Sequence, residues 1–130
     1  MTDTNEAYIP GVCNIGKAET RRRKLIGWIA LIFCITTWAA FILLKVATPW
    51  RLLLFFPAMI AAIGFLQAAW HFCAKYGLNG VFNFGRNVGK TDSVEQAEYR
   101  RQDRRTALQI IGLSALAGAV VAGTAYLIPL

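Results

Sequence analysis

Apolar and polar positions alternate along this chain on a long scale, with three uncharged stretches separated by charged segments. The uncharged stretches cover residues 25–44, 52–74 and 110–130, which are 20, 23 and 21 residues long. About 20 apolar residues at a rise of about 1.5 Å each cross a hydrocarbon core of roughly 30 Å. A helix satisfies its own backbone groups in lipid, which offers them no partners. The pattern therefore predicts an all-α polytopic membrane protein with three transmembrane helices.

The spacing of these stretches predicts how the chain is organised. Residues 46–51 connect the first two stretches so tightly that we expect an antiparallel helical hairpin. The first stretch is longer than a typical signal-peptide core and follows a polar leader, so we expect it to be retained. We predict four parts, namely a cytoplasmic N-terminal segment (1–24), a transmembrane hairpin (25–74), a cytoplasmic loop and helix start (75–105), and a third transmembrane helix (106–130).

Lysine and arginine are distributed unevenly between the two sides that this topology creates. Five precede the first span and seven lie in the second connection, whereas only two lie in the first connection and none follows the third span. An excess of Lys and Arg in short loops marks the cytoplasmic side of a membrane. We therefore expect a cytoplasmic N-terminus and a C-terminus on the outside.

The charged segment before the third span has two parts. Residues 74–90 are rich in Gly and Asn and predict an irregular loop that rests on the bilayer. Asp92 and Ser93 are each followed three residues later by an acidic or amide side chain, which is typical of a capping box at a helix start. Because no Gly or Pro follows until Gly112, we expect one long helix running from the cytoplasm into the third span.

Small residues recur every four positions in the third span and form two rows. The rows are Ser114, Gly118 and Ala122, and Ala115, Ala119 and Gly123. Such spacing lets two helix backbones approach closely in lipid. It predicts packing against the hairpin or against another chain, although small residues are also common in membrane helices generally.

His71 is the only histidine, and it lies near the cytoplasmic end of the second span. An intramembrane histidine can bind metal or haem or relay protons, but a single one supplies no second ligand. Gln67 lies four residues earlier on the same helical face, so the two could form a polar pair. The plainer interpretation is an interfacial histidine bound to backbone or water.

The three cysteines are Cys13, Cys34 and Cys73. Cys34 falls in mid-span and is expected to be a small apolar filler. Cys13 and Cys73 are both expected on the cytoplasmic side near cationic clusters, where a thiolate becomes more available. They are candidate thiols for a redox pair or a persulfide, with two unrelated thiols as the alternative.

Composition narrows the function classes. The chain is 56% hydrophobic and only 16% charged, with a formal charge of +7, whereas soluble domains have about 25% charged residues. No carboxylate lies within a span, and no phosphate loop, catalytic triad or metal-ligand spacing is present. No basic surface with interleaved aromatic residues suggests nucleic-acid binding. We expect no enzyme, no metal and no cofactor.

Two short motifs resemble a known family. The first is Asn14-Ile15-Gly16-x-x-Glu19-x-x-x-Arg23-x-x-x-Gly27, and the second is Phe72-Cys73-x-x-Tyr76-x-Leu78-x-Gly80. Together with the tight hairpin they resemble the YgaP-like transmembrane domain family over about residues 12–80. Ala74 stands where the family often has proline.

The resemblance implies a location and a set of residues. Members of this family are small helical hairpins of the bacterial inner membrane, some fused to a rhodanese sulfurtransferase domain, which this chain lacks. It implies dimerisation through the hairpin, association with sulfur-handling proteins, and a role for Cys73 and Tyr76. The matched positions are Asn14, Gly16, Glu19, Arg23, Cys73, Tyr76 and Gly80.

Three functions follow from these observations as expectations. The first is a non-catalytic accessory or assembly subunit of a larger membrane complex or homo-oligomer, with lipid and other membrane subunits as partners. The alternative is a thiol or sulfane-sulfur handling membrane protein that uses Cys73. A second alternative is a haem or metal redox subunit that binds through His71.

Overall fold

The computed structural model describes residues 8–129 of the chain and is mostly helical, at 71%. Its elements in chain order are α1 (Lys17–Leu43), the 3₁₀ helix η1 (Thr48–Leu54), α2 (Phe55–Trp70), α3 (Ala74–Asn79), β1 (Val81–Phe82), β2 (Asp92–Ser93) and α4 (Ala97–Leu127).

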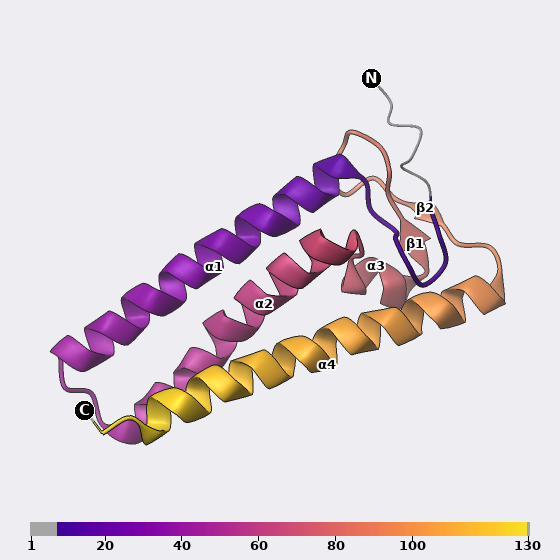
Figure 1. The fold of residues 1–130 in the computed structure, drawn as a ribbon. Coiled ribbons are helices and arrows are strands. Elements are labelled where there is room, and N and C mark those ends of the chain that lie inside the picture. The colour runs from indigo at the N-terminus through magenta and orange to yellow at the C-terminus, as the bar shows by residue number, and fades with distance from the viewer. Residues whose placement is uncertain (1–7, 130) are drawn as a thin grey trace.

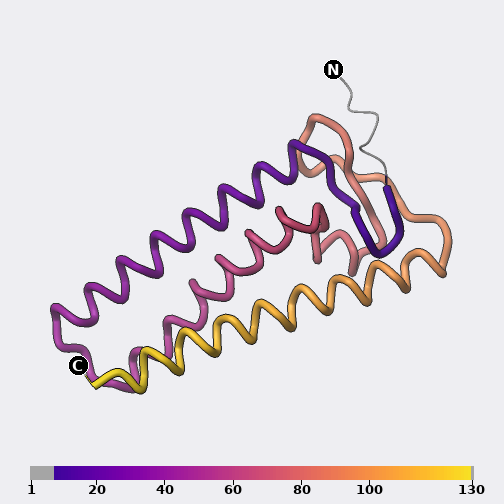
Figure 2. The backbone as a smooth tube through the Cα atoms, viewed as in Figure 1, coloured from indigo at the N-terminus to yellow at the C-terminus, as the bar shows by residue number. Residues whose placement is uncertain are grey.

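Three long helices dominate the molecule. They span Lys17–Leu43, Thr48–Trp70 and Ala97–Leu127, and each is long and apolar enough to cross a membrane, which confirms the predicted number. α2 lies between α1 and α4 (Figures 1 and 2). We call the end that carries β1 and β2 the strand end. The link from α1 to η1 and the C-terminal end of α4 lie together at the opposite end (Figure 1).

Glycines bring the helix backbones close together. A Cβ added to Gly64 in α2 would lie 2.7 Å from the backbone nitrogen of Gly27 in α1. A Cβ added to Gly118 in α4 would lie 2.9 Å from the backbone oxygen of Phe55 in α2. Lipid supplies no hydrophobic force between helices, so close contact of this kind is what holds such helices together.

The strand end corrects two expectations. Residues 74–90 were expected to be an irregular loop, but they contain α3 and β1, and β1 pairs antiparallel with β2. The second span was expected to reach residue 74, but α2 ends at Trp70 because His71 adopts a left-handed conformation with φ of 53°. The chain then reverses into α3, so the polar segment is a small folded unit.

The predicted capping box is also wrong. Asp92 and Ser93 form β2, and α4 begins at Ala97 after Gln96, without a side-chain cap. Val94 is only 3% exposed. Its backbone N–H donates to the carbonyl of Gly80 at 2.7 Å. Strand pairing and the burial of Val94 therefore outweigh the local cap. The expectation of one continuous helix is confirmed, because α4 runs unbroken for 31 residues.

Arg51 in η1 joins the helices at the end opposite the strands. Its Nη1 donates to the carbonyls of Ala125 at 3.1 Å and Ile128 at 2.7 Å, at the end of α4. Its guanidinium also lies over the ring of Trp38 in α1, 5.6 Å from the ring centroid. A cation at a helix C-terminus satisfies carbonyls that lack intrahelical partners.

We expect Arg51→Gln to loosen the last turn of α4. Hydrogen bonds from a charged group contribute about 1.5–3 kcal/mol each, so local opening at residues 125–128 should become at least tenfold more frequent. Hydrogen–deuterium exchange in detergent measures this opening. Lys45→Gln removes an exposed cation of the neighbouring connection and should leave that exchange unchanged; equal effects of both variants would contradict the capping role.

Candidate functional site

A polar cluster inside the described chain surrounds the carboxylate of Glu19, which is fully buried in the first turn of α1. Oε1 accepts from Arg23 at 2.7 Å. Oε2 accepts from the hydroxyl of Tyr76 at 2.5 Å, from Nδ2 of Asn83 at 2.8 Å and from the backbone N–H of Gly89 at 2.9 Å. One carboxylate therefore holds α1, α3 and the segment between β1 and β2 together.

Asn14 and Cys73 form the second part of the same cluster. The amide of Asn14 donates to the carbonyl of Cys73 at 3.1 Å and accepts from its backbone N–H at 2.7 Å. Nη2 of Arg23 lies 3.1 Å from Sγ of Cys73. Because Cys73 is only 2% exposed, its thiol faces a guanidinium in a protected site.

The tyrosine of the cluster is held in its neutral form. Burial and the hydrogen bond to Glu19 raise the pKa of Tyr76 above its ordinary value of 10.0. Ionisation would place a phenolate beside a carboxylate, and burial penalises the charged form as well.

This shift predicts loss of stability at alkaline pH. The pKa of Tyr76 is higher in the folded state than in the unfolded state. The contribution of Tyr76 to the free energy of unfolding is therefore complete below pH 10 and is lost as the pH rises through the folded pKa. The free energy of unfolding should therefore fall above pH 10, and Tyr76→Phe should flatten that fall. Unfolding in detergent at each pH measures the fall in the wild type and in Tyr76→Phe, and phenolate absorbance reports the ionisation of tyrosine. Tyr126→Phe, at an exposed position, is the control. If Tyr76→Phe leaves the fall unchanged, Tyr76 is not its source.

A second buried carboxylate fixes the N-terminal segment to α4. Asp103 is fully buried and accepts from the hydroxyl of Tyr8 at 2.6 Å and from the backbone N–H of Gly11 at 2.8 Å. The hydroxyl of Thr106 donates to the carbonyl of Gly11 at 2.6 Å. Burial and the bond to Asp103 raise the pKa of Tyr8.

The motif residues lie at or beside one site, although Arg23 of the first motif and Cys73 of the second are 50 positions apart in sequence. Five of the seven have a side chain or backbone group in the cluster just described, and the other two shape its edges. The backbone N–H of Gly16 donates to the carbonyl of Asn83 at 2.9 Å. Gly80 has a φ of +69°, and a Cβ there would lie 2.7 Å from Cδ of Arg100. These residues connect the start of α1 to the segment after α2.

The predicted pair of His71 and Gln67 is not formed. The His71 side chain is exposed, and its backbone carbonyl accepts from the N–H groups of Asn14 and Ile15. Gln67 is buried, and its Oε1 accepts from the N–H of Ala74 at 2.8 Å. The turn at His71 separates the two side chains. Among residues 8–129, no group of three His, Cys, Asp or Glu is placed to hold a metal ion.

The remaining predicted residues separate into packed and unpacked positions. Ser114, Gly118 and Ala122 are buried, whereas Ala119 is exposed and Ala115 and Gly123 are half-buried. Only the first row therefore packs tightly within the chain. Cys34 is buried in a cluster with Leu54 and Ala58, as expected for an apolar filler. Cys13 is half-buried, and none of the three cysteines forms a disulfide within residues 8–129.

Sequence reasoning missed several residues of these clusters. Asn83, Gly89 and Tyr8 were not singled out, because nothing in a Gly- and Asn-rich segment marks one amide as buried. Asp103 carried a usable signal. It stands among four arginines, yet it lies at helical spacing from Ala107, Ile110 and Ser114, which are buried, and this pattern predicts an inward face.

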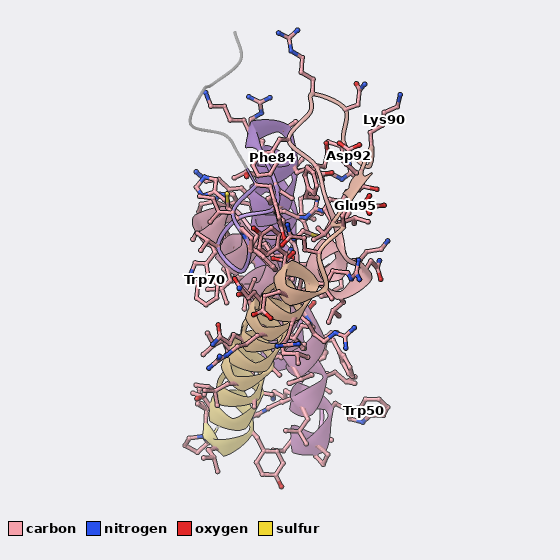
Figure 3. The ribbon with its side chains drawn as sticks, turned by 90° about the vertical axis from the view of Figure 1, so that its right-hand side faces the viewer. Trp50, Trp70, Phe84, Lys90, Asp92 and Glu95 are labelled. Carbon is pink, nitrogen blue, oxygen red and sulfur yellow. The ribbon has the colours of Figure 1, made fainter. Side chains whose placement is uncertain are left out.

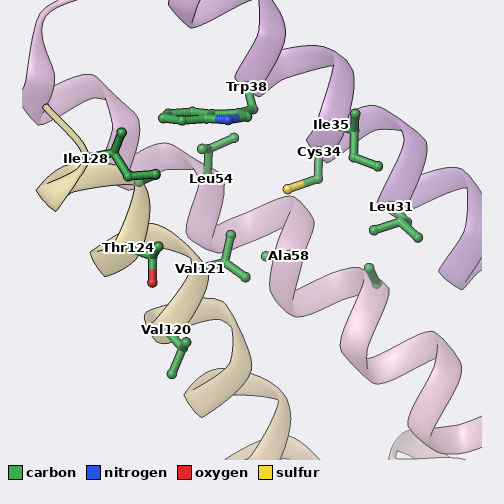
Figure 4. A pocket seen from close by; sticks show the side chains of 12 residues that line it. Leu31, Cys34, Ile35, Trp38, Leu54, Ala58, Val120, Val121, Thr124 and Ile128 are labelled. Carbon is green, nitrogen blue, oxygen red and sulfur yellow. The ribbon is translucent and has the colours of Figure 1, made fainter. Parts of the chain in front are cut away.

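An apolar cleft of about 400 Å³ lies between α1, α2 and α4 (Figure 4). Its walls include Leu31, Trp38, Leu54 and Val121, and the polar groups of its labelled side chains are the indole N–H of Trp38, the thiol of Cys34 and the hydroxyl of Thr124. No acid or base lines it. The cleft is therefore lined mainly by hydrocarbon side chains, which suit an apolar occupant.

Comparisons with protein-family models, with curated proteins and with solved structures find no match for this chain. The likeness to the YgaP-like family therefore stays a prediction that rests on the motif residues of the buried cluster.

Proposed function

We propose that this chain is a non-catalytic accessory or assembly subunit of a larger membrane complex or homo-oligomer in the bacterial inner membrane. In this proposal the first two spans form an antiparallel hairpin, the N-terminus and the strand end are cytoplasmic, and the C-terminus is outside. The observation that carries the proposal is that Glu19 and Asp103, the two fully buried carboxylates among residues 8–129, are satisfied by groups of the chain itself. These two carboxylates therefore hold the fold together, and neither of them is left without a donor for proton or cation chemistry.

The exposed surface supports the same proposal. Large apolar side chains such as Ile32, Phe33 and Phe56 are about 60% exposed in the isolated chain. Lipid or other membrane subunits must cover them. Trp50 lies at the end opposite Lys90, Asp92 and Glu95, whereas Trp70 lies nearer the strand end (Figure 3). Trp near both ends suits a chain whose ends meet the two membrane interfaces.

Co-purification tests the proposed role. The tagged full chain is extracted from a bacterial membrane in mild detergent after brief chemical crosslinking, and its mass is measured by light scattering. We expect a second copy or another membrane protein in a fixed ratio. Recovery as a lone monomer with and without crosslinking would contradict the role. A reporter fused after Leu130 tests the orientation, and activity on the cytoplasmic side would overturn it.

A second candidate is sulfane-sulfur handling at Cys73, and the contact between Arg23 and Sγ favours it. In this chemistry the thiolate attacks the outer sulfur of a donor persulfide, a new S–S bond forms, and the donor thiolate leaves. Cationic surroundings stabilise thiolates and so support such attack.

Thiol labelling tests the second candidate. Vesicles are treated with a cysteine-specific reagent or a low-molecular-weight persulfide, and modified positions are found by mass spectrometry. The candidate predicts persulfide at Cys73 that Cys73→Ser abolishes and Cys34→Ser leaves intact. If Cys73 stays unmodified under conditions that modify Cys13, the candidate is wrong.

A further inference from the structure

The outward face of α4 carries two cations that have no partner in the described chain. Arg104 and Arg105 are exposed, and neither makes a hydrogen bond or ion pair with any of residues 8–129. Their neighbours are engaged elsewhere, because Asp103 faces inward to Tyr8 and Arg101 pairs with Glu98 at 3.0 Å. An anionic ligand is therefore the complement that these two guanidinium groups lack.

An open apolar track begins directly below the two arginines. Leu108, 56% exposed, lies between them on the helix surface, and Gly112 follows one turn later. A Cβ at Gly112 or at Gly123 would meet nothing within 4 Å. Ala119 between them is exposed. Residues 112, 119 and 123 therefore leave a shallow strip on α4 beside Leu116, which is 60% exposed.

The charges decide what covers this strip. Two copies related by a two-fold axis along the membrane normal would bring the same face together. Arg104 and Arg105 of one copy would then meet the same residues of the other in a water-poor contact, where like charges are costly. A lipid with an anionic headgroup presents opposite charge at the arginines and hydrocarbon along the strip.

We infer that this face of α4 binds an anionic phospholipid of the cytoplasmic leaflet. Arg104 and Arg105 bind the phosphate of the anionic headgroup, and an acyl chain lies along the strip from Gly112 to Gly123. Arginine suits phosphate because its planar donors bind two oxygens at once. The inference rests on the proposed membrane location and orientation.

Native mass spectrometry of the full chain, released from nanodiscs of mixed phosphatidylcholine and phosphatidylglycerol, tests the inference. Each basic residue near an anionic leaflet changes lipid affinity about fivefold. We expect phosphatidylglycerol to be retained preferentially, and Arg104→Gln with Arg105→Gln to lower that preference by at least about fivefold. Arg86→Gln with Lys90→Gln makes the same charge change in the exposed segment between the strands, and it should alter the preference less than twofold.

A further variant separates headgroup from acyl-chain binding. Gly112→Leu places a side chain on the strip in open space, so the fold should persist while retention of both lipids falls. Equal losses in the two double variants, Arg104→Gln with Arg105→Gln and Arg86→Gln with Lys90→Gln, would mean that net charge alone sets the preference and would overturn the site. Dimers released without bound lipid would overturn it in favour of a second copy. Failure of the chain to enter nanodiscs would instead overturn the proposed membrane location.

Discussion

Replacing Glu19 with glutamine is expected to lower the free energy of unfolding by about 3 kcal/mol. Removing one member of a buried charge pair leaves the other uncompensated, which costs about 3–5 kcal/mol. Here Arg23 loses its carboxylate, and the amide of glutamine turns a donor toward groups that are already donors, namely Asn83 and the N–H of Gly89. Unfolding in mild detergent, followed by circular dichroism, measures the loss.

The exposed pair of α4 provides the control for this prediction. Glu98→Gln removes the partner of Arg101, and these side chains are 57% and 76% exposed. Exposed pairs contribute about 0–1 kcal/mol, so little change is expected. If Glu19→Gln is no more destabilising than Glu98→Gln, the cluster does not hold the strand end together.

Proteolysis of residues 83–90 should also accelerate in Glu19→Gln alone, because Gly89 is released.

Gly64→Leu should separate α1 from α2 and destabilise the protein by about 3 kcal/mol. The added Cβ would lie 2.7 Å from the nitrogen of Gly27 and 2.8 Å from the carbonyl oxygen of Arg23. These are backbone atoms that cannot rotate away, so the helices themselves must move, and overpacking costs about 1–3 kcal/mol even where side chains can adjust. The midpoint of thermal unfolding in detergent measures this effect.

The matched control is the same substitution at Gly112. A Cβ there meets nothing within 4 Å. Leucine also favours the helix over glycine, by up to ~1 kcal/mol. Gly112→Leu should therefore leave the unfolding midpoint unchanged or raise it slightly. Similar losses at both positions would mean that helix packing at Gly64 is not what limits stability.

The three long helices could be predicted from sequence, because length and absence of charge suffice to mark them. Their ends could not. His71 lies in an uncharged stretch, yet it terminates α2 because its carbonyl accepts from Asn14 and Ile15 on a distant segment. Asp92 and Ser93 have a local helix-start pattern but pair with β1 instead. In both places a long-range partner outweighed the local preference.

The candidate site was predicted as residues but not as an arrangement. Glu19, Arg23, Cys73 and Tyr76 were chosen from motif resemblance, and the structure brings them together. Their hydrogen-bond partners Asn83 and Gly89 were not chosen. Periodicity reports only which face of a regular element is buried, and these two residues lie outside helices.

By itself, the sequence determined the helical class, the three apolar helices and the uneven distribution of cations, because each depends on residue type summed over a local stretch. Only the tertiary structure decided which polar groups are buried, which row of small residues on α4 packs within the chain, and that Arg104 and Arg105 find no partner among residues 8–129. Those properties depend on contacts between segments up to 95 positions apart, and no local window contains both partners.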